Sequence, residues 1–414
     1  MPEGTKKFHA VNDLRVFGMR GACAVLALSG ALAALGPGQA VAGDKEIAVL
    51  EALLAPGALD LGLFDAAFLK AVPPDQIEHG IDPLKAKIGP VVGIEPRGGS
   101  SYAIETATYE IDAAITLDAD GRIAGLNFRA PIVKAASIDD VLKEIAAIAP
   151  QHAYLALKDG APLYADHPEM ALAVGSAFKL GILKVLSDDI DAGARKWSDV
   201  VTLGPDTRSL PSGFLGTWPL GSPVTLHTLA ALMISISDNT AADTLLKLVG
   251  RGRVEAALRI EPVLSTRELF VLKANDDLRA KYVAADLEGK RAALAEADAL
   301  PLPDAGKVQT VYDAGVEWEL APRKLCALIA AVAGLDVMQI NPGVANSADW
   351  QSVAYKGGSE TGVLSFTTAM TGKDGAHWCV SAVWNAPAAI DEQAAGTAYA
   401  GLLAKLAQQQ PTSP

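Results

Sequence analysis

Three short segments of the sequence combine residue types that could activate a serine. Ser176 and Lys179 are three positions apart, so on a helix their side chains would share one face and could touch. Ser237 and Asn239 belong to a Ser-Asp-Asn run, and Lys356 opens a Lys-Gly-Gly-Ser run. Each segment alone is a weak signal, because such pairs arise by chance and Ser-Asp-Asn is an ordinary helix cap.

The chemistry that these residues could perform together is acyl transfer. A serine hydroxyl is a poor nucleophile until a base removes its proton. Apolar residues surround Lys179, and burial disfavours an ammonium, so this lysine could act as a neutral base. Ser176 would precede a helix expected over residues 177–186, whose free N–H groups favour an oxyanion. Ser237, on a loop between two helices, could relay a proton to the leaving group, and Lys356, on an edge strand, would attract an anionic substrate.

The three segments occur on an expected helix, loop and strand, in that order. This set resembles the S-x-x-K, S-D-N and K-T-G motifs of class A β-lactamases and penicillin-binding proteins. Further similarity lies in residues 209–213, 218–219, 233–241, 265–270, 317–318 and 356–360. With these segments, the chain resembles the exported two-domain serine hydrolases typified by the protein of the clavulanic-acid biosynthetic cluster. The resemblance covers residues 45–410 and implies an isomerase-like domain joined to a β-lactamase-like domain.

The resemblance also implies three catalytic roles. Ser176 would be the acylated nucleophile, Lys179 its base and Ser237 the proton relay. The backbone N–H of Ser176 would form one half of the oxyanion hole.

Three further residues would bind substrate by the same resemblance. Asn239 would contact the substrate amide, Lys356 would hold an anionic group, and the backbone N–H of Ser359 would complete the oxyanion hole. Two departures weaken the case for rapid β-lactam hydrolysis. Gly357 stands where K-T-G has its threonine, and no E-x-x-L-N pattern supplies the glutamate that activates the deacylating water. Glu268 is a possible substitute for that glutamate, but we expect it to be structural.

The pattern of apolar residues predicts two domains, an α+β unit over residues 43–136 and a larger α+β or α/β unit over residues 137–410. In the first, helices are expected at 45–54, 61–71 and 82–88, and strands at 102–106, 109–117 and 123–128. This order resembles the cone-shaped fold of the ketosteroid-isomerase-like superfamily. In the second, strands near both ends enclose a run of helices, which predicts an antiparallel sheet flanked by helices, with the first hairpin pairing with the last strands. Residues 411–414 would form a tail.

The first 42 residues have the pattern of a secretory signal peptide. A basic start is followed by an apolar stretch over residues 21–36 and by Ala40-Val41-Ala42. The apolar stretch is shorter than the roughly 20 residues that a membrane span requires. We therefore expect cleavage after Ala42 and export to the periplasm or the extracellular space, with no membrane association afterwards.

Composition argues against several other functions. The net charge is −13, with 35 basic and 48 acidic residues, which gives no electrostatic reason to bind nucleic acid or an anionic membrane. Six scattered histidines without a paired spacing, and the lack of a C-x-x-C motif, argue against a zinc hydrolase. We expect neither a metal nor another cofactor. Cys326 and Cys379 remain after leader removal; they could pair in an oxidising compartment or remain buried free thiols.

The leading hypothesis is a secreted serine hydrolase that acts on a small-molecule ester, amide or β-lactam through an acyl-enzyme. A true β-lactamase is one alternative. A penicillin-binding module that is acylated without turnover is another, and a pseudoenzyme is disfavoured because all three motifs are present. The missing glutamate favours an esterase or an acylated sink over a β-lactamase.

Overall fold

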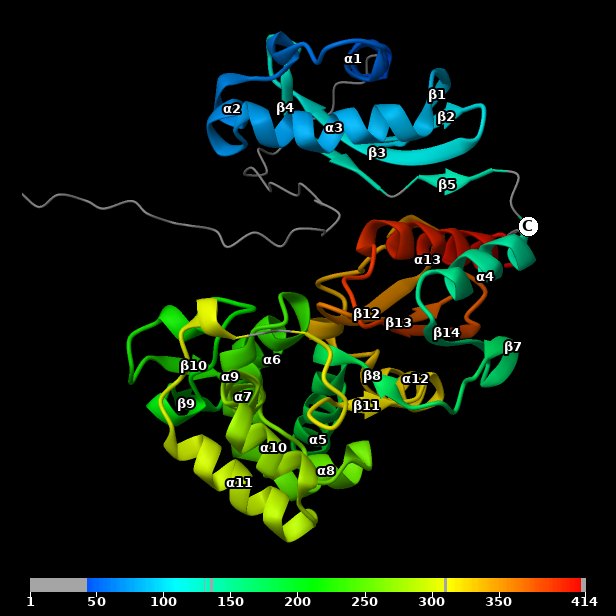
Figure 1. The fold of residues 1–414 in the computed structure, drawn as a ribbon. Coiled ribbons are helices and arrows are strands. Elements are labelled where there is room, and N and C mark those ends of the chain that lie inside the picture. The colour runs from blue at the N-terminus through cyan, green and yellow to red at the C-terminus, as the bar shows by residue number, and fades with distance from the viewer. Residues whose placement is uncertain (1–42, 130, 135–136, 309–310, 411–414) are drawn as a thin grey trace, which may run out of the picture.

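The computed structural model describes residues 43–129, 131–134, 137–308 and 311–410. The expected signal peptide and the four-residue tail lie outside the described residues. Helices precede a small antiparallel sheet, and a second part of the chain surrounds a larger antiparallel sheet (Figure 1). None of the described helices is both long enough and apolar enough to cross a membrane.

The first domain packs helices on one face of a twisted sheet (Figure 1). Its helices are α1 (Asp44–Leu54), α2 (Ala66–Ala71) and α3 (Pro74–Ile88), with a 3₁₀ turn at Leu61–Leu63. Its strands are β1 (Val91–Gly98), β2 (Ser101–Thr106), β3 (Tyr109–Leu117), β4 (Ile123–Phe128) and β5 (Ile132–Val133). Strands β1 to β4 pair in chain order, and β5 pairs with β3. This arrangement matches the predicted order of helices and strands, while kinship with the isomerase-like superfamily stays a prediction.

Two helix boundaries in this domain differ from the sequence prediction. The helix expected over residues 61–71 is split, because the side chain of Asp65 accepts a hydrogen bond from the Phe68 N–H and starts a new helix there. The helix expected to begin at residue 82 begins at Pro74, and Pro83 lies inside it. Burial of an apolar stripe along α3 outweighs the local effect of that proline. The buried members of the stripe are Ile77, Ile81, Leu84 and Ile88.

The second domain is built on a five-stranded antiparallel sheet. Its strands are β6 (Gln151–Lys158), β7 (Ala161–Asp166), β12 (Ser352–Glu360), β13 (Val363–Thr371) and β14 (His377–Asn385). Their order is β12-β13-β14-β6-β7, so the first hairpin pairs with the last strands as predicted, and β12 is an edge strand. Apolar cores lie on both faces of this sheet.

Helices cover both faces of this sheet (Figure 1). α4 (Ile138–Ala147) and α13 (Glu392–Ala407) pack on one face, and α5 (Lys179–Asp191) and α12 (Pro322–Val332) on the other. Beyond α5 lie α6 (Leu226–Ser235), α7 (Asn239–Val249), α8 (Arg251–Leu258), α9 (Thr266–Ala274), α10 (Asp276–Ala284) and α11 (Leu287–Ala299). The pairs β8 (Leu172–Ala173) with β11 (Glu319–Leu320) and β9 (Val200–Thr202) with β10 (Pro223–Thr225) complete the described strands.

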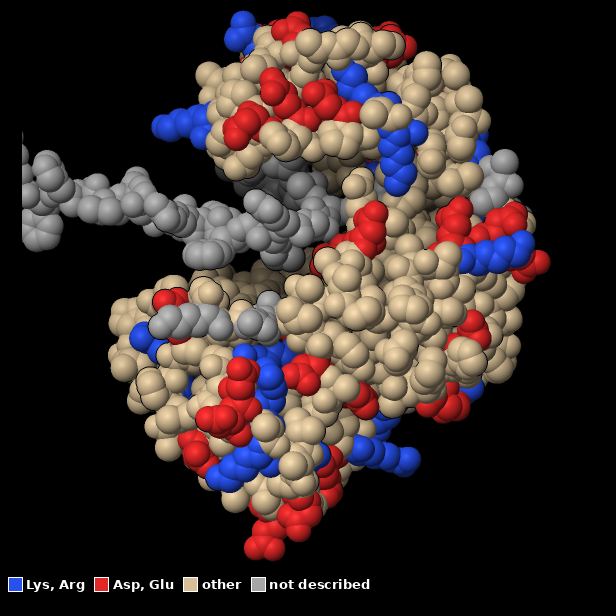
Figure 2. All heavy atoms as spheres, viewed as in Figure 1, with Lys and Arg blue, Asp and Glu red and all other residues tan. Residues whose placement is uncertain are grey.

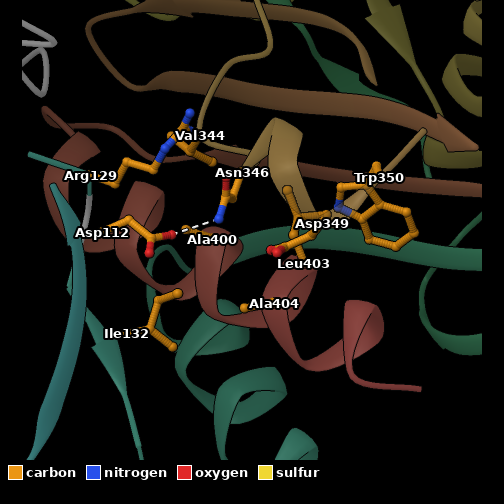
Figure 3. Close-up of a pocket in the computed structure, with 10 residues that line it drawn as sticks. All are labelled: Asp112, Arg129, Ile132, Val344, Asn346, Asp349, Trp350, Ala400, Leu403 and Ala404. Carbon is orange, nitrogen blue, oxygen red and sulfur yellow. Dashed lines mark hydrogen bonds between the residues drawn. The ribbon is translucent and has the colours of Figure 1, made fainter. Parts of the chain in front are cut away.

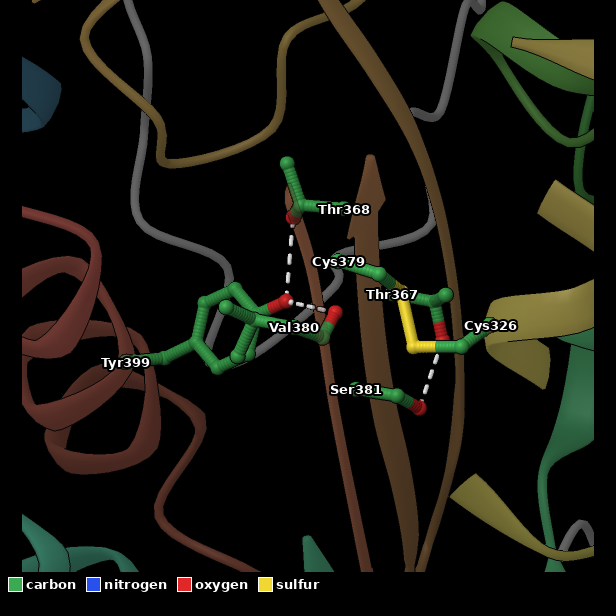
Figure 4. Close-up of a disulfide and its surroundings, with 7 residues drawn as sticks. All are labelled: Cys326, Thr367, Thr368, Cys379, Val380, Ser381 and Tyr399. Atoms are coloured by element: carbon green, nitrogen blue, oxygen red, sulfur yellow. Dashed lines mark hydrogen bonds between the residues drawn. A yellow bond between two sulfur atoms is a disulfide. The ribbon is translucent and has the colours of Figure 1, made fainter. Parts of the chain in front are cut away.

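A disulfide bond joins Cys326 of α12 to Cys379 of β14, with 5.9 Å between their Cα atoms (Figure 4). Of the two alternatives left open by the sequence, the structure has the paired form. On the opposite face of the sheet, the Tyr399 hydroxyl of α13 donates a hydrogen bond of 2.8 Å to the Val380 carbonyl. Helices are therefore fastened to neighbouring positions of β14 from both sides.

The two domains meet at the loop that leads into β12 (Figure 3). The Arg129 guanidinium donates a 2.6 Å hydrogen bond to the Ala345 carbonyl, and the Asn346 amide donates one of 2.7 Å to Asp112. Burial, and then the charge of Asp112, raise the pKa of the Asp349 carboxyl in the same cluster. The first domain therefore contacts the segment that positions the edge strand.

The charges on the visible surface are mixed. Acidic and basic side chains alternate over α10 and α11 in Figure 2, where Lys281 pairs with Glu296 and Arg279 with Asp276. On this face the structure gathers no field of one sign.

Candidate active site

The segment before Ser176 is held firmly by the sheet. Asn385, at the end of β14, accepts a hydrogen bond from the Ala173 N–H and donates one to the Ala173 carbonyl, each 2.9 Å long. Ser176 then lies in a 3₁₀ turn (Gly175–Phe178), and α5 begins only at Lys179. The expected helix therefore starts later than predicted, but Ser176 Oγ still lies 3.1 Å from Lys179 Nζ.

Lys179 is fully buried and lies between two acceptors and two hydroxyls. Its Nζ donates 2.6 Å hydrogen bonds to the Ser237 carbonyl and to Asn239 Oδ1, and lies 3.1 Å from Ser237 Oγ. The Asn239 orientation is fixed, because its Nδ2 donates to the Leu210 carbonyl, which can only accept. A neutral amine has two hydrogens for those two acceptors and one lone pair left for a serine hydroxyl.

The electrostatics favour that neutral amine. Burial, followed by the positive charge of Lys356, lowers the pKa of Lys179 well below its usual value. Among the described residues, no carboxylate is hydrogen-bonded to Lys179. Lys179 is therefore suited to accept the proton of an attacking hydroxyl.

The loop that carries Ser237 is anchored by its neighbour Asp238. One Asp238 oxygen caps α7 by accepting from the Ala241 N–H, and the other accepts from the N–H groups of Phe214 and Leu215. Ser237 itself has a φ of 60°, a left-handed conformation that costs energy and is often found at functional sites. This turn directs both the carbonyl and the hydroxyl of Ser237 at Lys179.

The edge strand β12 brings the third motif to the same place. Lys356 is buried, and its Nζ donates a 3.1 Å hydrogen bond to Ser237 Oγ. Burial lowers the pKa of Lys356 to about 7. A side chain at Gly358 would collide with the Val174 carbonyl and the Ser176 nitrogen, so a glycine is required for this close approach.

The fourth neighbour is the Ser359 backbone. A Cβ built on Gly175 would lie 3.3 Å from Ser359 N, so the two segments that carry the expected oxyanion-hole N–H groups are in contact. The Ser359 side chain is exposed, on the strand face opposite to Lys356. The structure thus brings together Ser176, Lys179, Ser237, Asn239, Lys356 and the backbone of Ser359, while their roles stay predictions.

Glu268 lies away from this cluster and is fully engaged elsewhere. Its two oxygens accept hydrogen bonds of 2.6 and 2.9 Å from the Arg251 guanidinium, and Oε2 also accepts one of 2.6 Å from the Ser265 N–H. The side chain is fully buried. This geometry fits the structural role that we expected, because both oxygens of Glu268 already accept hydrogen bonds from Arg251 within a buried ion pair.

We predict that Glu268→Gln lowers stability but spares activity. Losing the charge removes a charge-assisted hydrogen bond to Arg251, which costs about 1.5 to 3 kcal/mol in the free energy of unfolding. Urea unfolding measures that loss, and ester turnover should stay within a few-fold of wild type. Glu288→Gln, on the exposed first turn of α11, is the matched control. A hundred-fold loss of turnover at unchanged stability would instead make Glu268 the deacylating base.

Sequence reasoning missed a buried ionic cluster beside the edge strand. Lys273 Nζ donates to Glu317 at 2.6 Å and to Glu360 at 2.7 and 2.8 Å. Burial, and then the charge of Glu360, raise the pKa of Glu317 to about 8. The cluster fastens α9 to β12, two residues beyond Gly358. Its members are 44 and 87 residues apart in the chain, so no local spacing could reveal them.

Comparison with known proteins relates the part of the chain that carries most of the candidate site to one protein family. Residues 134–300 match the model of the beta-lactamase enzyme family. This span contains Ser176, Lys179, Ser237 and Asn239, and ends before Lys356. The later part of the chain therefore holds a β-lactamase-like domain. No curated protein matches the chain.

Solved structures similar to the chain include two beta-lactamases and a protein named PBP-A. The beta-lactamase of Sphaerobacter thermophilus is 18% identical over 66% of this chain and 97% of its own, with a TM-score of 0.46. PBP-A is 16% identical over 65% of this chain and 95% of its own, with a TM-score of 0.45. The beta-lactamase of Desulfarculus baarsii is 16% identical over 66% and 98%, with a TM-score of 0.45.

Within the part of the chain that the structure describes, no three His, Cys, Asp or Glu side chains are grouped to hold a metal ion.

Proposed function

We propose that this protein is an exported serine hydrolase that forms an acyl-enzyme on Ser176 and acts on an ester, an amide or a β-lactam. The observation that carries the proposal is the contact of buried Lys179 with the hydroxyls of both Ser176 and Ser237, each at 3.1 Å. The disulfide between Cys326 and Cys379 supports export, because such bonds persist in oxidising compartments.

Acylation follows from the hydrogen-bond geometry. Ser176 Oγ attacks the acyl carbonyl carbon while its proton passes to the lone pair of Lys179. The N–H groups of Ser176 and Ser359 stabilise the oxyanion. Lys179 then returns the proton through Ser237 Oγ to the leaving group, as the bond between the carbonyl carbon and that group breaks. Lys356 holds Ser237 and attracts an anionic substrate.

Deacylation separates the proposed hydrolase from its alternatives. Of the carboxylates that the structure describes, none is hydrogen-bonded to Ser176 or Ser237. Asp243 is buried nearby, but both its oxygens accept from the backbone N–H groups of Thr266 and Arg267. Lys179 is thus the available base for the deacylating water, which favours an esterase or an acylated penicillin-binding sink over a β-lactamase.

The test compares a small ester with a penicillin. We expect faster turnover of p-nitrophenyl acetate than of labelled benzylpenicillin, because a bulky penicilloyl group hinders water from reaching the ester carbon near Lys179. The penicilloyl-enzyme should accumulate in a burst. Quenched-flow sampling with intact-mass measurement would detect this burst. Efficient steady-state penicillin hydrolysis without a burst would make the protein a β-lactamase. Stable acylation with turnover of neither substrate would make it a sink.

A further inference from the structure

The buried ionic cluster beside the edge strand adjoins the end of β12 that carries Ser359. Glu360, a member of the cluster, directly follows Ser359 and shares a strand face with Gly358. On that face, a side chain at Gly358 would collide with Ser176 N, so the strand lies directly against the turn of the nucleophile. A displacement of Glu360 would therefore also move the Ser359 N–H relative to Ser176.

Glu317 of the same cluster is joined to the segment that precedes the nucleophile. It is followed by Trp318, whose carbonyl accepts a 2.9 Å hydrogen bond from the Val174 N–H. The Trp318 ring also stacks on Phe178, with 3.9 Å between the ring centroids. Glu317 therefore lies in a segment bonded to one half of the proposed oxyanion hole, and Glu360 lies in the strand that carries the other half.

The hydrogen bonds of the cluster determine how many charges it holds. Lys273 Nζ donates to three groups: the Val311 carbonyl at 3.0 Å, Glu317 Oε1 at 2.6 Å, and the Glu360 carboxylate at 2.7 and 2.8 Å. Three acceptors match the three hydrogens of an ammonium. One ionised carboxylate balances that positive charge, whereas a second would leave an uncompensated negative charge in a buried site.

Glu317 is the carboxyl group whose surroundings suit the neutral form. Its Oε1 accepts from Lys273 and from the Asp313 N–H, but its buried Oε2 receives no hydrogen bond from any donor that the structure describes. A carboxylate oxygen buried without a donor is costly, whereas a protonated carboxyl brings its own hydrogen. Burial, the charge of Glu360 and a hydrogen bond to Glu360 together raise the pKa of Glu317 to about 8, against the opposing charge of Lys273. At neutral pH, Glu317 is therefore protonated and donates to Glu360.

We propose that Glu317 keeps a proton that it donates to Glu360, and that this hydrogen bond positions the Ser359 N–H for the oxyanion of the acylation step. The inference rests on the proposed function, because that oxyanion belongs to acyl transfer at Ser176. Glu317 is then a positioning residue, which acts on the reaction through Glu360 and the backbone beside it. Loss of its proton places two negative charges next to each other, and their repulsion moves Glu360 and Ser359 out of position.

Three further ionisable side chains lie in the same segment as Glu317. Asp313 is paired with Arg279 of α10 at 3.0 Å, and Glu319 is exposed to solvent. Burial, followed by the charges of Glu319 and Glu317, raises the pKa of Tyr312, so this phenol stays neutral at pH 8. Glu317 is therefore the group of this segment that we expect to lose a proton near pH 8.

Stopped-flow acylation by the neutral ester p-nitrophenyl acetate tests the positioning role. The wild-type rate should fall about 5- to 10-fold between pH 7 and pH 9, because a pKa of about 8 leaves roughly one tenth of Glu317 protonated at pH 9. Glu317→Gln has a side-chain donor at every pH, so its rate should not fall over this range. Glu317→Leu has none, so at pH 7 it should already be about 10-fold slower than Glu317→Gln.

Glu319→Gln is the matched control, because it removes an exposed carboxylate two residues away and leaves the cluster intact. It should show the same fall above pH 7 as the wild type. Lys356 is present in both glutamine variants, so its own titration cannot cause a difference between them. An equal fall in the wild type and Glu317→Gln would overturn the positioning role.

Urea unfolding tests the proton without any chemistry. Glu317 holds its proton up to about pH 8 in the folded chain but releases it near pH 4.5 once unfolded, so its contribution to stability is lost as the pH rises toward 8. The urea midpoint of the wild type, relative to that of Glu317→Gln, should therefore fall between pH 5.5 and pH 8 and then level off. A difference between the midpoints that does not vary with pH would overturn the shared proton. If the wild type is not acylated at any pH, the proposed function fails and the positioning role with it, while the unfolding series still decides on the proton.

Discussion

Ser176→Ala should abolish covalent labelling by benzylpenicillin and by a fluorophosphonate. Lys179 lies 3.1 Å from the hydroxyls of both Ser176 and Ser237, so contact with the base does not by itself select the nucleophile. We expect the backbone to select Ser176. Ser176 N lies against Gly358, and Gly175 against Ser359 N, so the two segments that carry the proposed oxyanion-hole N–H groups are in contact. Ser237 instead shares its hydroxyl with Lys356.

Intact-mass measurement of the labelled protein checks this prediction. Ser237→Ala is the matched control: it removes the proton relay but keeps the nucleophile, so labelling should slow and still reach full stoichiometry. If Ser176→Ala is labelled as fully as wild type, the acyl group resides elsewhere, and Ser237 would be the first residue to examine by peptide mapping.

The central sheet could be predicted because the residue types within its strands favour β-structure without reference to distant contacts. Residues 377–384 are rich in β-branched and aromatic side chains, which favours a strand. A run of helices separates the first hairpin from the last strands, so these strands were expected to pair with each other. The order β14-β6-β7 follows that reasoning. In the first domain, the same logic gave the bounds of β3 and β4.

The helices from α8 to α11 were not predicted, for a physical reason. α8 and α10 each bury few apolar side chains, such as Val254 and Leu258 in α8, and are otherwise polar. Their positions depend on ion pairs such as Arg251 with Glu268, which link separate elements. Sequence periodicity cannot predict a helix whose burial is decided by partners far away in the chain.

In the candidate site, too, contacts between residues close in sequence could be predicted, and contacts between distant residues could not. The contact of Ser176 with Lys179 follows from a spacing of three residues, even though the turn there is 3₁₀ rather than α-helical. The environment of Gly357 could not be predicted from the sequence, because a glycine there indicates only that the expected threonine is missing. The structure shows that a Cβ at this position would collide with the Tyr355 hydroxyl, a contact that depends on packing along β12.

Lys179→Ala should slow acylation by about 10² to 10⁴, the usual contribution of a positioned general base. The base must be neutral, and burial, followed by the charge of Lys356, lowers the pKa of Lys179 well below its usual value. Below that pKa the lone pair holds a proton, so the wild-type acylation rate should fall as the pH is lowered. In Lys179→Ala this acid limb should disappear, because the group that titrates is gone.

The matched variant Lys356→Ala distinguishes a base from a nearby positive charge. It removes the second ammonium, whose charge contributes to the low pKa of Lys179, so the acid limb should move to higher pH. Stopped-flow acylation between pH 4 and pH 9, with a neutral ester as substrate, measures both effects without the demands of anion binding. Acylation of Lys179→Ala at the wild-type rate, with its acid limb intact, would assign proton removal to another group. Ser237 Oγ is the other hydroxyl in contact with Lys179, so the same pH series is measured for Ser237→Ala. This variant loses the proposed relay but keeps the base. Its acylation should therefore be slower than in wild type, while the acid limb remains.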